Sequence, residues 1–442
     1  MEFRRVLFRS LTLLKTGGRL VILVPSGIQT DEGCAPLRKL LTTEHTLLEI
    51  TSFENKGYSA KVNGDEKHVK IFPDVHPQYK FGFLKILKGV PTVRDHAFDA
   101  RFYLHDPAQI TSPPVRYSVE RMRQFSPENL SLMEFRSERD YELCAKVRSE
   151  HPLLGDLDYQ FRREFHVTED SHFFHKRRAE HLKAGQLPLF EGKMIFQFDS
   201  GYAPGTYYVV EKEAREELLR KEIFRLSQFV RESGSEVLEG EPLPESKEEL
   251  ETKLRQVFKA KEFKLQYEVP RLAYRKIGSS TNERTLIASL IAPRACLAES
   301  MNYLTPFTYR LGPNGKLEQE PLPGDFVLTV VALFNSLVLN YYIRNKISAN
   351  VNLFFLYELP IPKLADKLRA KLPAAAEKLL ATPHDTKERA RLEVLVAREA
   401  YGLDAADWEH LTGTFTYGSG DTKAELDEII ARSRELWCGG VS

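Results

Sequence analysis

The sequence predicts an α/β protein that begins with the second half of a doubly wound sheet and ends in a helical tail. Short apolar runs bounded by turn residues are typical of buried strands, and three occur at residues 20–24, 47–53 and 81–87. An amphipathic segment over residues 34–41 separates the first two runs. After residue 362 the chain is rich in Ala, Leu, Lys, Arg and Glu, with helical periodicity up to Trp437.

The composition sets broad limits on the class of protein. A chain of 442 residues predicts two to three domains. Its 63 basic and 62 acidic residues give a net charge of +1, a weak argument against DNA binding, because that affinity depends on local phosphate contacts. The four cysteines form no CxxC pair, so neither a zinc site nor a disulfide scaffold is indicated. The longest apolar run, residues 326–339, is too short to span a bilayer and predicts a buried helix.

Turn residues and short motifs mark the ends of the first strands. A Gly17-Gly18 turn leads into the first strand, which stops at Pro25-Ser26-Gly27. The second strand ends in Phe53-Glu54-Asn55, and Ile71-Phe72-Pro73 precedes the third, hairpin-like strand.

These motifs, in this order, resemble the C-terminal half of the catalytic domain of adenine-N6 DNA methyltransferases. The resemblance is to the Eco57I-type group (type IIG or BREX-like), whose chains carry both methylase and DNA-recognition regions. It implies that Phe72 stacks on the flipped adenine, because a base must leave the duplex to be methylated. The alternative is that Phe72 is an ordinary core or turn aromatic before a proline.

Two motifs of that family do not occur in the chain. Neither Asn-Pro-Pro-Tyr nor Asp-Pro-Pro-Tyr is present, and the glycines of residues 15–18 precede a strand instead of following one. The resemblance implies S-adenosyl-L-methionine as the cofactor of the full-length family, with its binding site and the catalytic residues expected to be missing here. We therefore expect residues 1–442 alone to be inactive in methyl transfer. Residues 1–10 are expected to be a non-native leader, because they look like translated vector sequence.

Further motifs resemble the family's target-recognition region. Residues 188–199 match "PL-aromatic-EGKMI-x-QFD", although many relatives carry His where this chain has Phe196. Residues 274–285 resemble "R-x-I-x-x-STNERT". The segments at 333–336 and 352–355 lead into Leu359-Pro360-Ile361-Pro362, which resembles the exit from recognition domains of type I specificity subunits. The ordered motifs extend over roughly residues 11 to 365.

Six residues of the STNERT region are candidates for DNA contact. Ser, Thr, Asn and Arg side chains supply hydrogen bonds to phosphates and base edges. The candidates are Arg275, Lys276, Ser280, Thr281, Asn282 and Arg284. We expect Arg284 to read a guanine and Lys276 to contact a phosphate. The alternative is that Thr281 or Asn282 caps a turn and that Arg284 pairs with Glu283 or another carboxylate.

A histidine-rich segment at residues 163–175 contains residue types that bind metals. The segment also resembles a stretch that follows the methylase in the same family and is not a metal motif there. We therefore expect no metal site in the chain.

The expected organisation has five parts: a leader (1–10), a partial methyltransferase domain (11–115), a connector (116–185), an α+β target-recognition domain (186–362) and a helical spacer (363–442). The expected function is that of a fragment of a site-specific DNA adenine-N6 methyltransferase from a restriction–modification or phage-defence system. Double-stranded DNA is the expected partner, together with possible restriction or defence subunits, in a bacterial or archaeal cytoplasm. The alternatives are a stand-alone DNA-specificity module resembling a type I specificity subunit and a non-DNA α/β protein.

Overall fold

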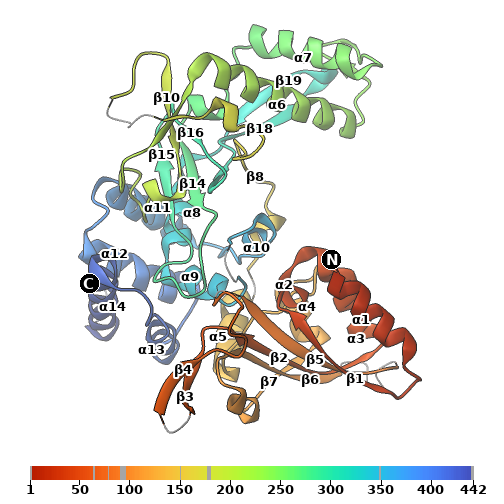
Figure 1. Ribbon diagram of the computed structural model, residues 1–442. Helices are drawn as coiled ribbons and strands as arrows, with labels where there is room; N and C mark the ends of the chain where they lie inside the picture. The colour runs from red at the N-terminus through yellow and green to blue at the C-terminus, as the bar shows by residue number, and fades with distance from the viewer. Residues whose placement is uncertain are drawn as a thin grey trace. The chain divides into compact units, whose positions relative to one another are not determined.

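The computed structural model divides the chain into two compact units of mixed α/β structure, coloured along the chain in Figure 1. It describes residues 2–62, 65–77, 79–89, 96–149, 151–176, 181–347 and 350–439. Unit 1 contains residues 1–153 and the short returns 342–348 and 357–361. Unit 2 contains residues 154–341, 349–356 and 362–442.

Unit 1 is built on a five-stranded sheet with the order β1-β5-β2-β6-β7. The strands are β1 (Arg19–Pro25), β2 (Thr46–Glu54), β5 (Lys80–Leu87), β6 (Ala97–Leu104) and β7 (Val115–Ser118). Strand β5 lies between β1 and β2 and is antiparallel to both, whereas β2 and β6 are parallel. The three apolar runs are therefore strands, as predicted. A separate hairpin, β3 (Tyr58–Val62) and β4 (Asp65–Val69), connects β2 to β5.

Helices of unit 1 include α1 (Glu2–Leu13), α2 (Gly27–Thr30), α3 (Ala35–Thr43), α4 (Val119–Phe125) and α5 (Glu138–Arg148). Helix α5 begins where the Ser137 hydroxyl accepts the Asp140 N–H, a side-chain cap that satisfies an otherwise unpaired donor. Helix α1 includes the expected leader. Leu7 and Leu11, four residues apart on one helix face, are both buried. The leader therefore forms part of a packed helix, and its non-native origin stays a prediction.

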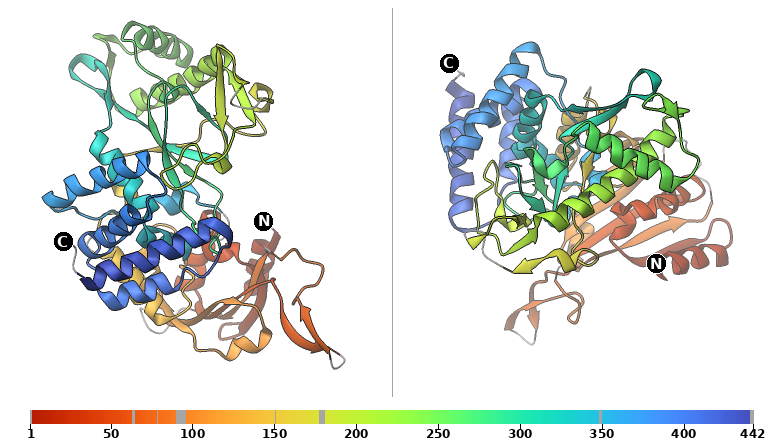
Figure 2. Two further views of the ribbon diagram at one scale, coloured as in Figure 1. Left: turned by 90° about the vertical axis from the view of Figure 1, so that its left-hand side faces the viewer. Right: turned by 90° about the horizontal axis from the view of Figure 1, so that it is seen from above.

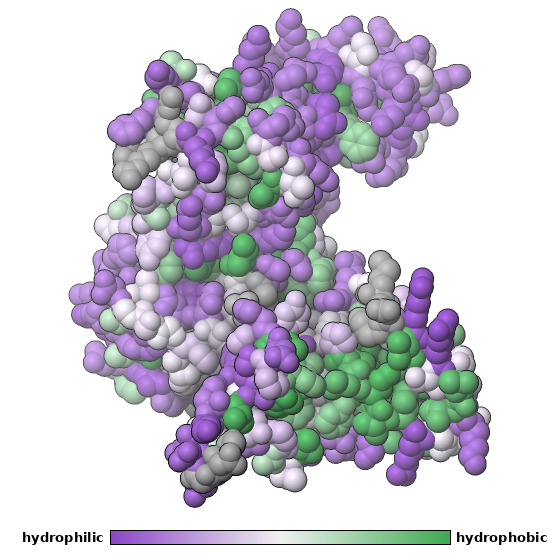
Figure 3. Space-filling model, viewed as in Figure 1, coloured by the Kyte–Doolittle hydropathy of each residue, from purple (hydrophilic) through white to green (hydrophobic). Residues whose placement is uncertain are grey.

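Strand β1 presents apolar side chains to solvent at the edge of this sheet. Among the strands that the structure describes, it pairs with β5 alone. Val21 and Leu23, two residues apart on one face, are 62% and 56% exposed. Hydrophobic residues gather over this part of unit 1 in Figure 3. An unpaired edge with exposed apolar side chains is a template for association.

Unit 2 contains two four-stranded sheets. One has the order β15-β14-β17-β8 and is formed by β8 (Phe161–Arg162), β14 (Arg271–Arg275), β15 (Ala288–Ile291) and β17 (Met301–Leu304). The other has the order β16-β10-β11-β9 and is formed by β9 (His175–Lys176), β10 (Gln186–Phe190), β11 (Tyr207–Val210) and β16 (Cys296–Leu297). Two-stranded ribbons add β12 (Val237–Leu238) with β13 (Glu241–Pro242), and β18 (Phe307–Leu311) with β19 (Leu317–Pro321).

Two long helices, α6 (Glu211–Glu232) and α7 (Lys247–Ala260), pack on one another near the second sheet. Their apolar faces share one core with β10 and β11, in which Leu187, Val209, Leu218 and Leu254 are buried. Burial of this apolar surface, at about 25 cal/mol per Å², supplies the main stabilisation of this part of unit 2.

The apolar run at 326–339 is a bent pair of helices, α8 (Gly324–Asn335) and α9 (Leu337–Arg344), which meet at 61°. Among the described residues, no single helix has the length and apolar composition needed to cross a membrane; this pair passes that test only when its two members are taken together. Asn335 explains the position of the bend. Its side chain accepts the Ala288 N–H and donates to the Ala288 carbonyl, so the helix end is fastened to β15.

After α10 (Leu353–Tyr357), the tail consists of α11 (Asp366–Ala381), α12 (Thr386–Val394), a π-helical turn (Leu395–Ala400), α13 (Ala405–Gly413) and α14 (Gly420–Gly439). The helical character predicted after residue 362 is therefore confirmed. The tail helices lie side by side in Figure 2. Trp408 of α13 stacks on Trp437 of α14, with ring centroids 5.5 Å apart and an interplanar angle of 10°.

We expect Leu23→Lys to leave the free energy of unfolding within about 0.5 kcal/mol of wild type, because surface substitutions usually do. The same change should lower both the binding of a hydrophobic dye and the self-association of the chain, measured by dye fluorescence and sedimentation. Leu84→Lys, in the buried core of the same sheet, is the control and should unfold unit 1. Unchanged dye binding in Leu23→Lys would contradict this account of the edge.

Candidate nucleic-acid interface

Phe72, the predicted base-stacking residue, lies in the loop between β4 and β5 of unit 1. The Asn55 side chain holds this loop by three hydrogen bonds. Its amide nitrogen donates to the carbonyls of Phe72 and Val75, each at 2.8 Å, and its oxygen accepts the Phe72 N–H at 3.0 Å. Asn55 is buried at the end of β2. The side chain of Asn55, in the Phe-Glu-Asn motif, therefore holds the Phe-Pro loop in place; we call these three hydrogen bonds the Asn55 clamp.

The Phe72 ring rests on a small aromatic cluster. It meets Phe81 edge to face, with centroids 4.6 Å apart and an angle of 71°, and Phe81 stacks on Phe53 at 5.6 Å. Edge-to-face contact fixes the orientation of a ring, and Phe81 covers at most one face of Phe72 in this geometry. The Phe72 side chain is half-buried. The base-stacking role of Phe72 stays a prediction.

A buried ion network fastens the two strand ends beside this loop. Lys80 Nζ lies 2.7 Å from Glu134 and 3.7 Å from Glu54. Glu54 is also paired with Lys56 and His105, each at 2.9 Å. Burial alone would raise the pKa of Glu54, but the hydrogen bonds from Lys56 and His105 and the charge of Lys80 lower it. Burial opposes the charge on Lys80 too, yet Glu134 and Glu54 together raise the pKa of its ammonium group.

Sequence reasoning missed this network, although Glu54 stands inside the Phe-Glu-Asn motif. Its signal was a charged residue, Glu54, at the buried end of β2, which in this structure is paired with Lys80 of β5; Lys80 is paired in turn with Glu134.

In unit 2, Arg275 joins the end of β14 to the Glu-Gly-Lys-Met-Ile segment. Its Nε donates to the Ile195 carbonyl at 2.9 Å, and its guanidinium lies 5.8 Å from the Phe196 ring and 6.0 Å from that of Tyr202. Burial lowers the pKa of Arg275. Phe196 stacks on Tyr202 and belongs to the hydrophobic core. Two of the sequence motifs thus meet at one cation–π contact.

Lys276 lies in a surface ion cluster. Its Nζ is 3.2 Å from Glu299, which also faces Arg163 at 3.6 Å and His166 at 3.5 Å. Lys276 and Glu299 are both half-buried, and the predicted phosphate contact of Lys276 stays a prediction.

The STNERT loop is held by hydrogen bonds from α9 and within the loop. The Asn340 side chain accepts the N–H groups of Thr285 and Leu286, each at 2.9 Å, and the Thr285 hydroxyl donates to the Ser279 carbonyl. Ser280 is buried, Thr281 is half-buried and Asn282 is exposed. Thr281 and Asn282 are thus the members of the loop, among those predicted, whose side chains reach the surface.

Arg284, predicted to read a guanine, does not lie on the protein surface. It is 2% exposed and its guanidinium faces Glu393 of α12 at 3.8 Å. The Glu393 carboxylate also accepts the Leu337 N–H at the start of α9. Because Arg284 is buried, its side chain has no surface on which to contact a DNA base, and this contradicts its predicted role. Pairing with a carboxylate, the alternative reading of this residue, is what the structure contains.

Among the described residues, no group of three or more potential metal ligands lies together. His166 accepts the Thr168 N–H, His172 packs on Phe173 at 4.0 Å, and His175 packs on Tyr208 at 5.1 Å.

The sequence matches no protein-family model and no curated protein. Solved structures similar in fold include the Type IIL restriction-modification enzyme MmeI in complex with DNA, with a TM-score of 0.40, 10% identity, and 95% of this chain and 50% of that chain covered. For the Type ISP enzyme LlaBIII bound to DNA, the TM-score is 0.35 and the identity 12%, with 86% of this chain and 26% of that chain covered. For the DrdV–DNA complex, the TM-score is 0.34 and the identity 10%, with 99% of this chain and 51% of that chain covered. This chain spans about half of MmeI, and at these TM-scores we infer no function from the likeness.

Arg284→Ala should lower the free energy of unfolding by about 3–5 kcal/mol, because it leaves the buried Glu393 carboxylate without its ion-pair partner. Urea denaturation measures this loss. Asn282→Ala, an exposed change in the same loop, is the control and should stay within about 0.5 kcal/mol of wild type. An Arg284→Ala protein of wild-type stability would show that the pair is not structural.

Glu54 should make unit 1 sensitive to acid. Because folding lowers the pKa of Glu54 below its ordinary value of 4.5, its stabilisation is present above pH 4.5 and is lost as the pH falls through the lowered value. We expect Glu54→Gln to be less stable than wild type at pH 7, with the difference vanishing in acid, as measured by denaturation at a series of pH values. The exposed Glu66→Gln is the control, and a difference that is constant with pH would refute the assignment.

Proposed function

We propose that this chain supplies the target recognition and part of the flipped-base pocket of a site-specific adenine-N6 DNA methyltransferase of a restriction–modification or phage-defence system. The observation that carries this proposal is the clamp of Asn55 on the Phe72 loop. A buried amide that makes three hydrogen bonds to one loop fixes the position of its aromatic ring before any ligand arrives. Preorganised aromatic surfaces of this kind are what an extruded base requires.

The methyl donor does not fit the residues present. The Gly17-Gly18 turn uses its N–H groups within the backbone, since Gly17 donates to the Lys88 carbonyl and Gly18 to that of Lys15. These N–H groups therefore hold the turn closed and offer no cradle for a ligand. We propose that this turn does not hold S-adenosyl-L-methionine. The roles proposed for this chain are to hold the adenine on Phe72 and to select the DNA site.

A stand-alone DNA-specificity module is the second candidate. It is favoured by the compactness of unit 2, whose sheets and helices form hydrophobic cores of their own. The two candidates differ in what Phe72 does, because a pure specificity module has no use for a base-stacking ring.

The test uses a duplex with 2-aminopurine opposite a mismatched base, which lowers the cost of extrusion. Phe72→Ala should weaken binding of this probe by about 1–3 kcal/mol, the usual loss when base–aromatic stacking is removed. It should also raise the fluorescence of the bound probe, whereas Phe72→Trp should preserve affinity and quenching. Phe224→Ala, a partly exposed aromatic of unit 2, is the control. Equal fluorescence in the wild-type and Phe72→Ala complexes would favour the specificity module.

A further inference from the structure

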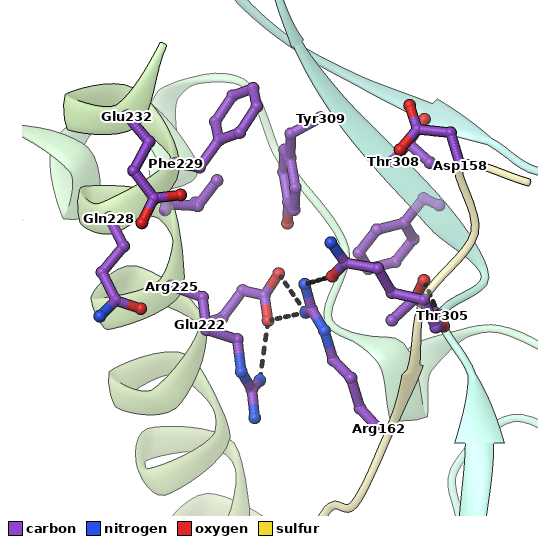
Figure 4. A pocket seen from close by; sticks show the side chains of 13 residues that line it. Asp158, Arg162, Glu222, Arg225, Gln228, Phe229, Glu232, Thr305, Thr308 and Tyr309 are labelled. Carbon is purple, nitrogen blue, oxygen red and sulfur yellow. Dashed lines mark hydrogen bonds and ion pairs between the residues drawn. The ribbon is translucent and has the colours of Figure 1, made fainter. Parts of the chain in front are cut away.

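Unit 2 contains a polar pocket of about 480 Å³ between the C-terminal half of α6 and the segment that leads into β8 (Figure 4). Of the lining residues with hydrogen-bonding side chains, six lie in two rows: Asp158, Gln160 and Arg162 on one side, and Arg225, Gln228 and Glu232 on the other. No motif in the sequence pointed to this pocket.

Each row follows from the geometry of its element. Asp158, Gln160 and Arg162 alternate along the chain, whereas Tyr159 stacks on Phe326 and Phe161 packs against Phe334. Alternation of this kind is what an extended segment produces. On α6, the spacing of three and then four residues places the second row along one helix face. The pocket is therefore bordered by two rows of polar side chains, one on the segment that leads into β8 and one on α6.

Glu222 orients the arginines of both rows. Its side chain is buried and lies 3.1 Å from Arg162 Nη1 and 3.2 Å from Arg225 Nη1, and it accepts a hydrogen bond from Gln266 at 2.7 Å. Arg162 Nη2 also donates to Gln160 at 2.8 Å. A guanidinium has five N–H donors, so each arginine can hold Glu222 and still donate to a ligand. Figure 4 shows both guanidinium groups converging on Glu222.

The charges of the pocket favour base edges over phosphates. The lining contains two arginines and three carboxylates, those of Glu222, Asp158 and Glu232, so there is no excess positive charge of the kind that binds the DNA backbone. The side-chain types instead match the major-groove contacts: Arg to guanine, Gln to adenine, and Asp or Glu to the amino group of cytosine.

We propose that these two rows read the base edges of double-stranded DNA and determine the recognition sequence. Arg162 and Arg225 read guanine, Gln228 reads adenine, and Glu222 is a positioning residue that fixes the two guanidinium groups. The inference rests on the proposed function, that the chain selects a DNA site. It moves sequence readout from the STNERT loop to the pocket.

The experiment selects binding sites for purified 1–442 from a random double-stranded library and sequences them. Wild type should enrich a defined motif. Gln228→Ala should relax one position of that motif and Arg225→Ala a guanine position, each losing roughly 5- to 150-fold in discrimination against the wrong base. Arg220→Ala, an exposed arginine of the same helix paired with Glu217, is the matched control and should keep the wild-type motif. Gln228 is exposed, so its variant tests the proposal even if Arg225→Ala unfolds.

The outcomes separate the inference from the proposed function. A wild-type motif that stays unchanged in Gln228→Ala and in folded Arg225→Ala overturns the inference and leaves the proposed function standing. A motif that relaxes in Asn282→Ala but not in Gln228→Ala overturns it in favour of the STNERT loop. Failure of the wild type to enrich any motif overturns the proposed function and the inference with it.

Discussion

The buried ion pair of Glu164 and Arg271 is the interaction around which unit 2 is arranged. Both side chains are excluded from solvent, and their charged atoms lie 3.1 Å apart. Arg271 also donates to the carbonyls of Ala295 and Gln266, and the Leu297 N–H donates to Glu164. Burial raises the pKa of Glu164 above its ordinary value, and the charge of Arg271 offsets only part of this rise. Desolvating two charges is costly unless the remaining donors and acceptors are satisfied. The two carbonyls and the Leu297 N–H meet most of this need, whereas the buried Arg271 Nε has no hydrogen-bond partner among the described residues.

This pair lies next to elements that carry candidate DNA contacts. Glu164 follows Arg162 by two residues, and its carbonyl accepts a hydrogen bond from Lys221, one residue before Glu222 on α6. Arg271 begins β14, which ends at Arg275. The segment that carries Arg162, helix α6 and the start of β14 therefore meet close to one buried ion pair.

What the sequence could predict was local. Turn-bounded apolar runs identified β1, β2 and β5 because strand signals depend on neighbouring residues, and helical periodicity identified the tail after residue 362 for the same reason. Arg284 was misjudged because its partner, Glu393, lies in α12, far along the chain. The pocket was missed because Glu222 becomes a buried acceptor only when Arg162, from a distant segment, packs against it. Ion pairs of this kind follow from tertiary structure and have no local signature.

The stack of Trp408 on Trp437 has a spectroscopic consequence. The chain has two tryptophans and eighteen tyrosines, and both indoles lie in this one contact between α13 and α14. Light absorbed by indole alone therefore reports on the helical tail and on no other part of the protein. Unfolding of the tail can therefore be followed by tryptophan fluorescence without a contribution from the sheets.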